Sequence, residues 1–266
     1  MADRSPGDRA SGAGRSGPVP DHVGDGGRGP EWAAVREFGR RLGALGWVDD
    51  LLVAGSLATG DHVPGVSDLD LVAVVDGPVG AARLAALTAL HRELDHGVAA
   101  RLDLGCAYVD RAGLPELPAR HPTWTHGTLV DRVVSGVTRA ELVRSGVAVL
   151  GRPPTRVLPA MSDDDVRDAA RAELLGYWAW ASRRPWSFLD PVLADLALTS
   201  MARGRHALAT GHLMTKTEAV EHAAAPGWLV DHLRTRRRGG TVRSPRLRTG
   251  VIAWRDVRRT VALARA

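Results

Sequence analysis

The sequence has little sulfur and no long hydrophobic run. Its one cysteine, Cys106, cannot form an internal disulfide, and no cysteine–histidine cluster has the spacing of a zinc site. No segment approaches the ~18 apolar residues of a membrane-spanning helix, and the N-terminus lacks the apolar core of a secretory signal. These absences exclude a disulfide scaffold, a zinc module and a membrane protein. We therefore expect a cytoplasmic protein, and we take it to be a monomer.

Asparagine and glutamine are absent, and lysine and isoleucine occur once each. Lys216 is the single lysine and Ile252 the single isoleucine, whereas arginine is abundant. This skew is typical of a GC-rich genome, so the number of arginines says little about function. The net charge of +5 is too small to indicate a nucleic-acid binder. Lys216 is instead a candidate for a position where arginine cannot serve, because an ammonium and a guanidinium bind phosphate differently.

Residues 1–29 are rich in Gly, Pro, Ser, Asp and Arg and predict a disordered tail. After them, residues 30–152 show the pattern of an α/β domain with a small mixed sheet. The spacing predicts helices over 31–45 and 81–97 and strands over 49–56, 67–76 and 100–110.

Residues 125–154 predict a helix, a turn and a short apolar strand, ending in two prolines. From residue 153 to 266 the pattern is helical, and Ser162 followed by three aspartates predicts a capped helix start. The fold class is therefore an α/β (α+β) domain followed by an all-α domain. We expect Cys106 to be buried and inert, and His91, His96, His121 and His126 to lie on the surface.

One short stretch of the sequence contains the candidate metal- and phosphate-binding residues. A strand ends at Gly55-Ser56, and twelve residues after Ser56 the next strand opens with Asp68-Leu69-Asp70. Side chains two apart on a strand point to the same face, so Asp68 and Asp70 would present paired carboxylates. Like charges so close repel unless a cation lies between them, and hard oxygen ligands suit Mg²⁺. Gly55 lets the backbone approach a phosphate, and Ser56 supplies a hydroxyl donor, so a triphosphate–Mg²⁺ site is predicted.

A third acid, Asp103, is expected on the strand beside Asp68 and Asp70, where it would accept a proton from an attacking hydroxyl. The set indicates in-line nucleotidyl transfer. Taken singly, each aspartate is equally compatible with a solvated strand end. A non-catalytic nucleotide-binding or regulatory module remains an alternative, although such a site would be expected to have lost one of these acids.

At these residues the sequence resembles the nucleotidyltransferase superfamily, and within it the aminoglycoside adenylyltransferases that act on streptomycin and spectinomycin. The resemblance rests on GSLATGDHVPGVSDLDLV, on VRSGVAVLGRPP and on the helical segment from LALTSM to EAVEHA. It implies transfer of AMP from ATP to a hydroxyl of a small cationic acceptor, release of pyrophosphate and antibiotic modification.

The resemblance also implies site residues. It makes Asp68 and Asp70 the ligands of Mg²⁺, with two ions expected, Ser56 a triphosphate donor and Asp103 the general base. Glu is common in the family where this chain has Asp103. Arg203 and Lys216 match a basic pair that binds the triphosphate.

Recognition of the acceptor is expected from an aromatic residue and acids of the helical domain. Trp186, Asp190 and Asp195 lie in the matching stretch, although its spacing departs from the family pattern. A core aromatic and helix-capping acids explain the same residues equally well. The arginine-rich run 234–248 is either a solvated loop or a surface for RNA, so a tRNA, a protein or another metabolite remains an alternative acceptor.

Overall fold

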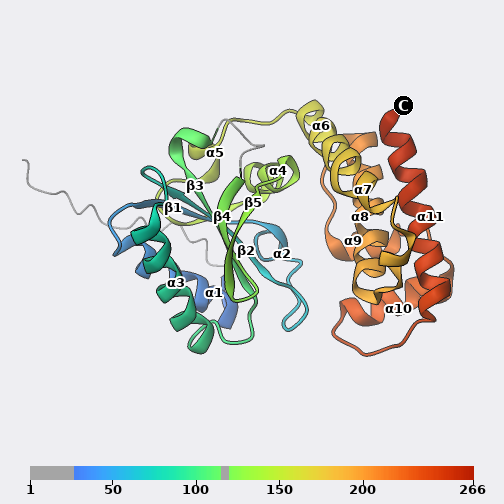
Figure 1. The fold of residues 1–266 in the computed structure, drawn as a ribbon, viewed down its shortest axis with the longest axis horizontal. Coiled ribbons are helices and arrows are strands. Elements are labelled where there is room, and N and C mark those ends of the chain that lie inside the picture. Colours follow the sequence, from blue (N-terminus) through green and yellow to red (C-terminus); the bar gives the residue numbers. More distant parts are fainter. Residues whose placement is uncertain (1–26, 115–119) are drawn as a thin grey trace, which may run out of the picture.

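The computed structural model describes residues 27–114 and 120–266. The predicted tail lies outside the described residues except for 27–29. An α/β part built on one sheet lies beside a part made of helices (Figure 1). The predicted fold class is confirmed. No helix among the described residues is long and apolar enough to cross a bilayer.

The sheet has six strands in the order β5-β4-β3-β2-β1-β6. Their bounds are Val48–Val53 (β1), Leu69–Val75 (β2), Leu104–Asp110 (β3), Arg120–Thr125 (β4), Thr128–Val133 (β5) and Val147–Leu150 (β6). β2 and β3 are parallel, and all other neighbours are antiparallel. The parallel pair needs a crossover, which is supplied by helix α3 (Ala81–His96).

The two faces of the sheet bury different layers. Alternate residues of β2 beginning at Leu69 pack with α1 (Pro30–Gly43) and α3 in one apolar core. The other set, including Val72 and Val74, packs toward α4 (Gly136–Ser145) and α5 (Pro154–Val157). Asp70 belongs to this second set by alternation. It therefore lies at the edge of an apolar layer, at the start of the strand.

The hairpin β4–β5 corrects the prediction for residues 125–154. Only α4 is helical there, and β6 is the predicted short strand. The turn residues His126 and Gly127 have φ of 48° and 74°, as in the two-residue turn whose twist matches paired strands. The His126-Gly127 pair was the local signal for this turn, whereas β5 (TLVDRV) shows no regular polar–apolar alternation, and the helical interpretation of this segment was wrong.

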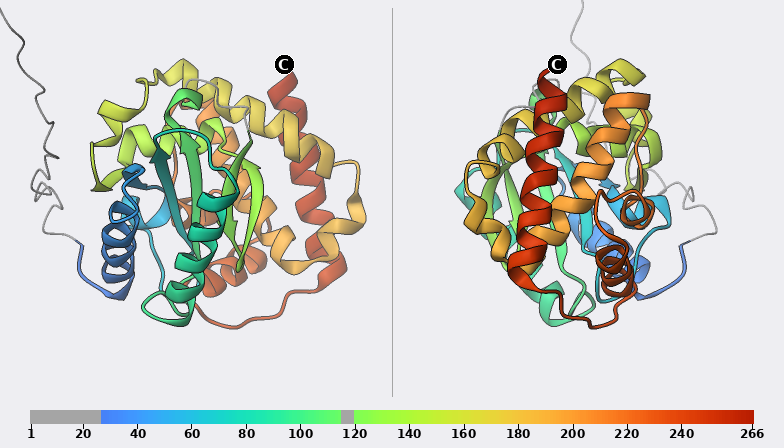
Figure 2. Two further views of the ribbon diagram at one scale, coloured as in Figure 1. Left: turned by 60° about the vertical axis from the view of Figure 1, so that its left-hand side comes forward. Right: turned by 90° about the vertical axis from the view of Figure 1, so that its right-hand side faces the viewer.

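The helical part is built around two long helices, α8 (Pro191–Thr210) and α11 (Arg246–Arg265), which pack against each other (Figure 2). The other elements are α6 (Asp163–Glu173), η2 (Leu174–Trp178), α7 (Ala179–Ala181), η3 (Pro185–Leu189), α9 (Lys216–Glu221) and α10 (Gly227–Arg237). The predicted cap is present, since the Ser162 hydroxyl accepts from the Asp165 N–H and the Asp165 carboxylate accepts from the Ser162 N–H.

Two of the four histidines are buried, contrary to the prediction. His91 packs in the core, stacked on Trp124, with its Nε2 2.6 Å from the Tyr108 hydroxyl. His121 is buried as well. Cys106 is buried as predicted, and burial raises the pKa of its thiol to about 12.

Candidate active site

The turn after β1 brings the backbone against a carboxylate. Helix α2 (Gly55–Thr59) begins two residues after β1 ends, and Gly55 has φ of +62°. A Cβ at Gly55 would lie 2.5 Å from Asp70 Oδ2, so a side chain does not fit there. The next residue, Ser56, is 6% exposed, and its hydroxyl has no hydrogen-bond partner in the part of the chain that the structure describes. A buried hydroxyl without a partner is costly unless a ligand supplies the partner.

Asp68 directly precedes β2, and Asp70 is its second residue. The pKa of Asp70 is raised to about 6, first by burial and then by the negative charge of Asp68. The charges of Lys216 and Arg203 oppose this rise. The predicted carboxylate pair is therefore present, and a cation between the two acids would relieve their repulsion.

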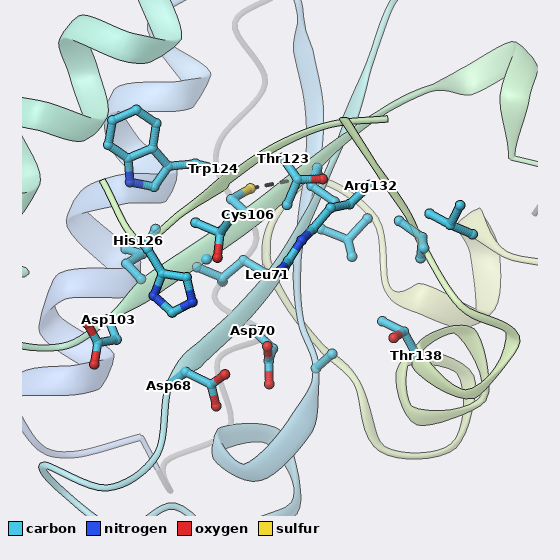
Figure 3. Close-up of a pocket in the computed structure, with 18 residues that line it drawn as sticks. Asp68, Asp70, Leu71, Asp103, Cys106, Thr123, Trp124, His126, Arg132 and Thr138 are labelled. Atoms are coloured by element: carbon cyan, nitrogen blue, oxygen red, sulfur yellow. Dashed lines mark hydrogen bonds between the residues drawn. The ribbon is translucent and has the colours of Figure 1, made fainter. Parts of the chain in front are cut away.

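The sequence predicted Asp103 on the third strand, but the structure places it one residue before β3 begins. Its carbonyl accepts from the Leu69 N–H at 3.2 Å, which aligns it with Asp68, and its φ is +43°. Figure 3 shows the Asp103 carboxylate set apart from those of Asp68 and Asp70. Within residues 27–114 and 120–266, no group of three or more His, Cys, Asp or Glu side chains is arranged to hold a metal ion.

The helical part faces the Asp68–Asp70 pair across a cleft. A cleft of about 470 Å³ is lined on one side by Ser56 and Asp70 and on the other by Arg203 and Lys216. Lys216 Nζ lies 3.4 Å from Asp68 Oδ1. The structure therefore brings together five residues singled out in the sequence from two parts of the chain.

A second cavity, of about 210 Å³, lies on the other side of Asp70 (Figure 3). Asp68, Asp70 and Asp103 line it together with His126 and Arg132 of the hairpin. Asp70 thus separates two cavities, and both open onto the same carboxylate.

Comparison with known proteins agrees with this geometry. Residues 34–105, which span β1, α2, β2 and the approach to β3, match the model of the nucleotidyltransferase domain. This part of the chain is therefore similar to a nucleotidyltransferase domain. No curated protein matches the chain in sequence.

The fold extends beyond that domain. The crystal structure of the spectinomycin adenyltransferase AAD(9) from Enterococcus faecialis, solved with ATP and spectinomycin, superposes with a TM-score of 0.61 at 15% identity. The match covers 86% of this chain and 98% of the other, so the two proteins share the fold of both parts.

Three further residues in or beside the cleft were not predicted from the sequence: Glu141, Asp61 and Arg237. Glu141 of α4 accepts a hydrogen bond from Arg203, whose Nε also donates to the Met214 carbonyl at 2.8 Å. Arg237 of α10 donates to the Asp61 carboxylate at 2.9 Å and to its carbonyl. Glu141 and Arg203 lie 62 residues apart, and Asp61 and Arg237 lie 176 residues apart, so no local sequence pattern predicts these pairs.

Arg237 and Asp61 join the two parts of the protein. Arg237 also donates to the Ser67 hydroxyl at 3.0 Å, and Asp61 accepts from the Thr217 N–H at 3.1 Å. Burial raises the pKa of Asp61, but the hydrogen bonds from Thr217 and the charge of Arg237 outweigh it, so the pKa is lowered overall. These contacts fix the loop before Asp68 against the start of α9, where Lys216 lies.

The predicted acceptor residues lie elsewhere. Trp186 is 65% exposed on η3, and Asp190 caps α8 by accepting from the Val192 N–H at 2.9 Å. Asp195 accepts two hydrogen bonds from Arg236, at 2.5 and 2.9 Å. None of Trp186, Asp190 and Asp195 lines either cavity beside Asp70. Their role in acceptor binding stays a prediction.

Proposed function

We propose that the protein transfers AMP from ATP to a hydroxyl group of a small acceptor and releases pyrophosphate. The observation that carries this proposal is that Asp70 and Lys216 line one cleft, while Lys216 Nζ lies 3.4 Å from the neighbouring Asp68 carboxylate. Paired carboxylates and a facing cation are what a metal–triphosphate complex needs on its two sides.

The triphosphate would occupy the 470 Å³ cleft. The unpartnered Ser56 hydroxyl would donate to a phosphate oxygen, and Lys216 would leave Asp68 to bind the triphosphate. Arg203 is held in place by Glu141 and the Met214 carbonyl, so its remaining donors are oriented before the nucleotide arrives.

Asp68 and Asp70 fit Mg²⁺, because their oxygens are hard ligands and a cation would offset both the burial of Asp70 and its repulsion by Asp68, which together raise the pKa of Asp70. When bound, magnesium would neutralise charge on the α-phosphate and on the departing pyrophosphate. We propose two ions, as the family resemblance implies.

The acceptor would approach from the 210 Å³ cavity. Its hydroxyl oxygen forms a bond to the α-phosphorus as the bond from that phosphorus to the bridging oxygen of the β-phosphate breaks. The hydroxyl proton passes to the carboxylate of Asp103, which lines this cavity, and then to solvent. Pyrophosphate takes the electron pair of the broken bond.

An aminoglycoside is the acceptor class we propose, since the structural neighbour was solved with spectinomycin and ATP. Such a reaction would inactivate an antibiotic. It consumes ATP, so we place it in the cytoplasm.

The test is incubation with α-labelled ATP, Mg²⁺ and a panel that includes streptomycin and spectinomycin, followed by mass spectrometry for an added AMP. Asp68→Asn should lower transfer by at least on the order of a hundredfold while the protein stays folded. Asp168→Asn, an exposed aspartate paired with Arg171 on α6, is the matched control. Wild-type transfer by Asp68→Asn would overturn the assignment, as would the absence of both product and any thermal shift with MgATP.

A further inference from the structure

The helical part contains a further cavity, distinct from the two beside Asp70, that the proposed reaction does not use. It has a volume of about 680 Å³, within the range of small-molecule sites, and shares no lining residue with either cavity beside Asp70. The start of α8, the end of α10, the start of α11 and the loop between α10 and α11 enclose it; that loop runs along the lower edge of the helical part in Figure 1. Its arginines belong to the basic run 234–248.

The cavity carries uncompensated positive charge. Three arginines line it, and Asp195 is its one acid. Asp195 is already bound by Arg236, which also donates to the Val242 carbonyl at 3.0 Å. No carboxylate of the described residues pairs with Arg243 or Arg246. Two positive charges therefore remain at one concave surface.

The start of α11 adds to this charge. The helix has 20 residues and begins at Arg246, with Pro245 as a cap that offers no side-chain acceptor and no acid in the first turn. The positive end of the helix dipole and the unpaired N–H groups of the first turn therefore face arginines where carboxylates would be favourable. An anion at this position would compensate both.

Thr249 provides an observation independent of charge. It is 2% exposed, lines the cavity, and its hydroxyl has no hydrogen-bond partner among the described residues. A helical threonine usually satisfies its hydroxyl with the carbonyl four residues earlier, so this hydroxyl remains available to a ligand oxygen.

We propose that this cavity binds a small phosphorylated organic molecule. A phosphate monoester carries a charge near −2 and three acceptor oxygens, which match two unpaired arginines and a hydroxyl, whereas a carboxylate offers half that charge. The organic part would lie on Val192 and Val242, which line the same cavity. A polynucleotide would instead need cations spread along an open groove with aromatic platforms. The proposal does not depend on AMP transfer.

The experiment measures thermal stability in a low-salt chloride buffer with inorganic phosphate and with phenyl phosphate as probes. At about ten times Kd, each should raise the melting temperature of the wild type by about 3 to 6 °C. The probe with the phenyl group should bind more tightly than phosphate alone. Arg243→Ser and Arg246→Ser should each weaken binding about tenfold or more, because each removes a charge-assisted hydrogen bond.

Three control variants accompany this experiment: the first tests the effect of charge alone, and the other two separate this cavity from the ATP cleft. Arg255→Ser lowers the charge of α11 by the same amount on an exposed side chain that does not line the cavity, and it should leave binding unchanged. The double variant Arg243→Ser/Arg246→Ser should keep its thermal shift with MgATP, and Lys216→Ala should keep its shift with phenyl phosphate.

Arg246→Glu tests the proposal with a variant that is expected to remain folded while it loses the ligand. It places an acid in the first turn of α11, so it should raise the melting temperature without ligand and abolish the shift with phenyl phosphate. Equal shifts in the wild type, the double variant and Arg255→Ser would overturn the proposal, as would no shift at all. Tighter, salt-sensitive binding of an RNA oligonucleotide that displaces phenyl phosphate would also overturn it.

Discussion

At the scale of single residues, Gly55 sets the distance between the chain and Asp70. Gly55→Ala combines backbone strain at φ of +62° with a Cβ 2.5 Å from the Asp70 carboxylate, so we expect a loss of about 3 kcal/mol of unfolding free energy and no MgATP thermal shift. Gly60→Ala is the control: it has φ of +74° with no atom within 4 Å of its Cβ. It should cost about 1 kcal/mol and keep the shift. Urea unfolding measures both, and equal costs would contradict the close approach.

His91 gives a prediction for pH at the same scale. Burial lowers its pKa to about 3, from an ordinary value of 6.5. The unfolded chain therefore binds the proton first as pH falls, so the stability that His91 contributes is complete above pH 6.5 and is lost progressively down to pH 3. Acidification from pH 7 to 4.5 should remove about 3 kcal/mol through this residue.

Urea unfolding across this pH range measures the effect. His91→Gln should flatten the pH dependence even if it lowers stability overall, because the group that titrates is gone. His96→Gln, at the exposed end of the same helix, should retain the wild-type slope. A wild-type slope in His91→Gln would mean that other groups cause the acid sensitivity.

At the scale of elements, the start of α9 is held by a residue of the α/β part. Asp61 accepts from both Thr217 and Arg237, and both side chains of the Asp61–Arg237 pair are about nine-tenths buried. Asp61→Asn and Arg237→Lys should each destabilise the protein by about 2 kcal/mol, with a coupling energy above about 1 kcal/mol in a double-mutant cycle.

Both variants should raise KM for ATP more than they lower kcat, because Lys216 loses its fixed position at the cleft. The control is the exposed pair of Glu221 and Arg234 within the helical part, for which a coupling of at most about 1 kcal/mol is expected. Unchanged KM together with lost stability would assign Asp61 and Arg237 to folding alone.

Sequence patterns predicted elements where the signal was local. The glycine–serine turn and the two aspartates fall within a stretch that one strand, one turn and a second strand position without help from elsewhere, so Gly55, Ser56, Asp68 and Asp70 came together as predicted. The β4–β5 hairpin was not predicted, because β5 (TLVDRV) lacks a regular polar–apolar alternation that would mark it as a strand. The strand predicted over 100–110 begins only at Leu104, so Asp103 lies just before it.

The long-range ion pairs could not be predicted from the sequence. With so many arginines in the chain, nothing marks Arg236 as the partner of Asp195, Arg203 as the partner of Glu141 or Arg237 as the partner of Asp61. Tertiary packing selects these pairs: Arg203–Glu141 and Arg237–Asp61 join the two parts, and Arg236–Asp195 joins two helices of the helical part. Asp195 shows the consequence: a carboxylate expected to face a cationic acceptor is instead bound by a neighbouring helix.

At the scale of the whole molecule, the two parts meet through Lys216 and Asp68. The ammonium lies 3.4 Å from the carboxylate that we propose as a metal ligand, so without nucleotide it competes with a divalent cation. Lys216→Ala should therefore bind Mg²⁺ alone more tightly than the wild type, yet bind MgATP about tenfold more weakly, because a charged contact to phosphate is lost. Isothermal titration measures both affinities. If both change in the same direction, Lys216 does not exchange between carboxylate and phosphate.

The position of the only lysine also gives the protein a chemical handle. Lys216 is the one side-chain amine of the sequence, and it lies at the junction of the two parts, so an amine-reactive reagent that modifies lysine would label that junction. A fluorophore attached there would report the opening and closing of the cleft from a single defined point. Protection of Lys216 from labelling by nucleotide would measure occupancy without any knowledge of the acceptor.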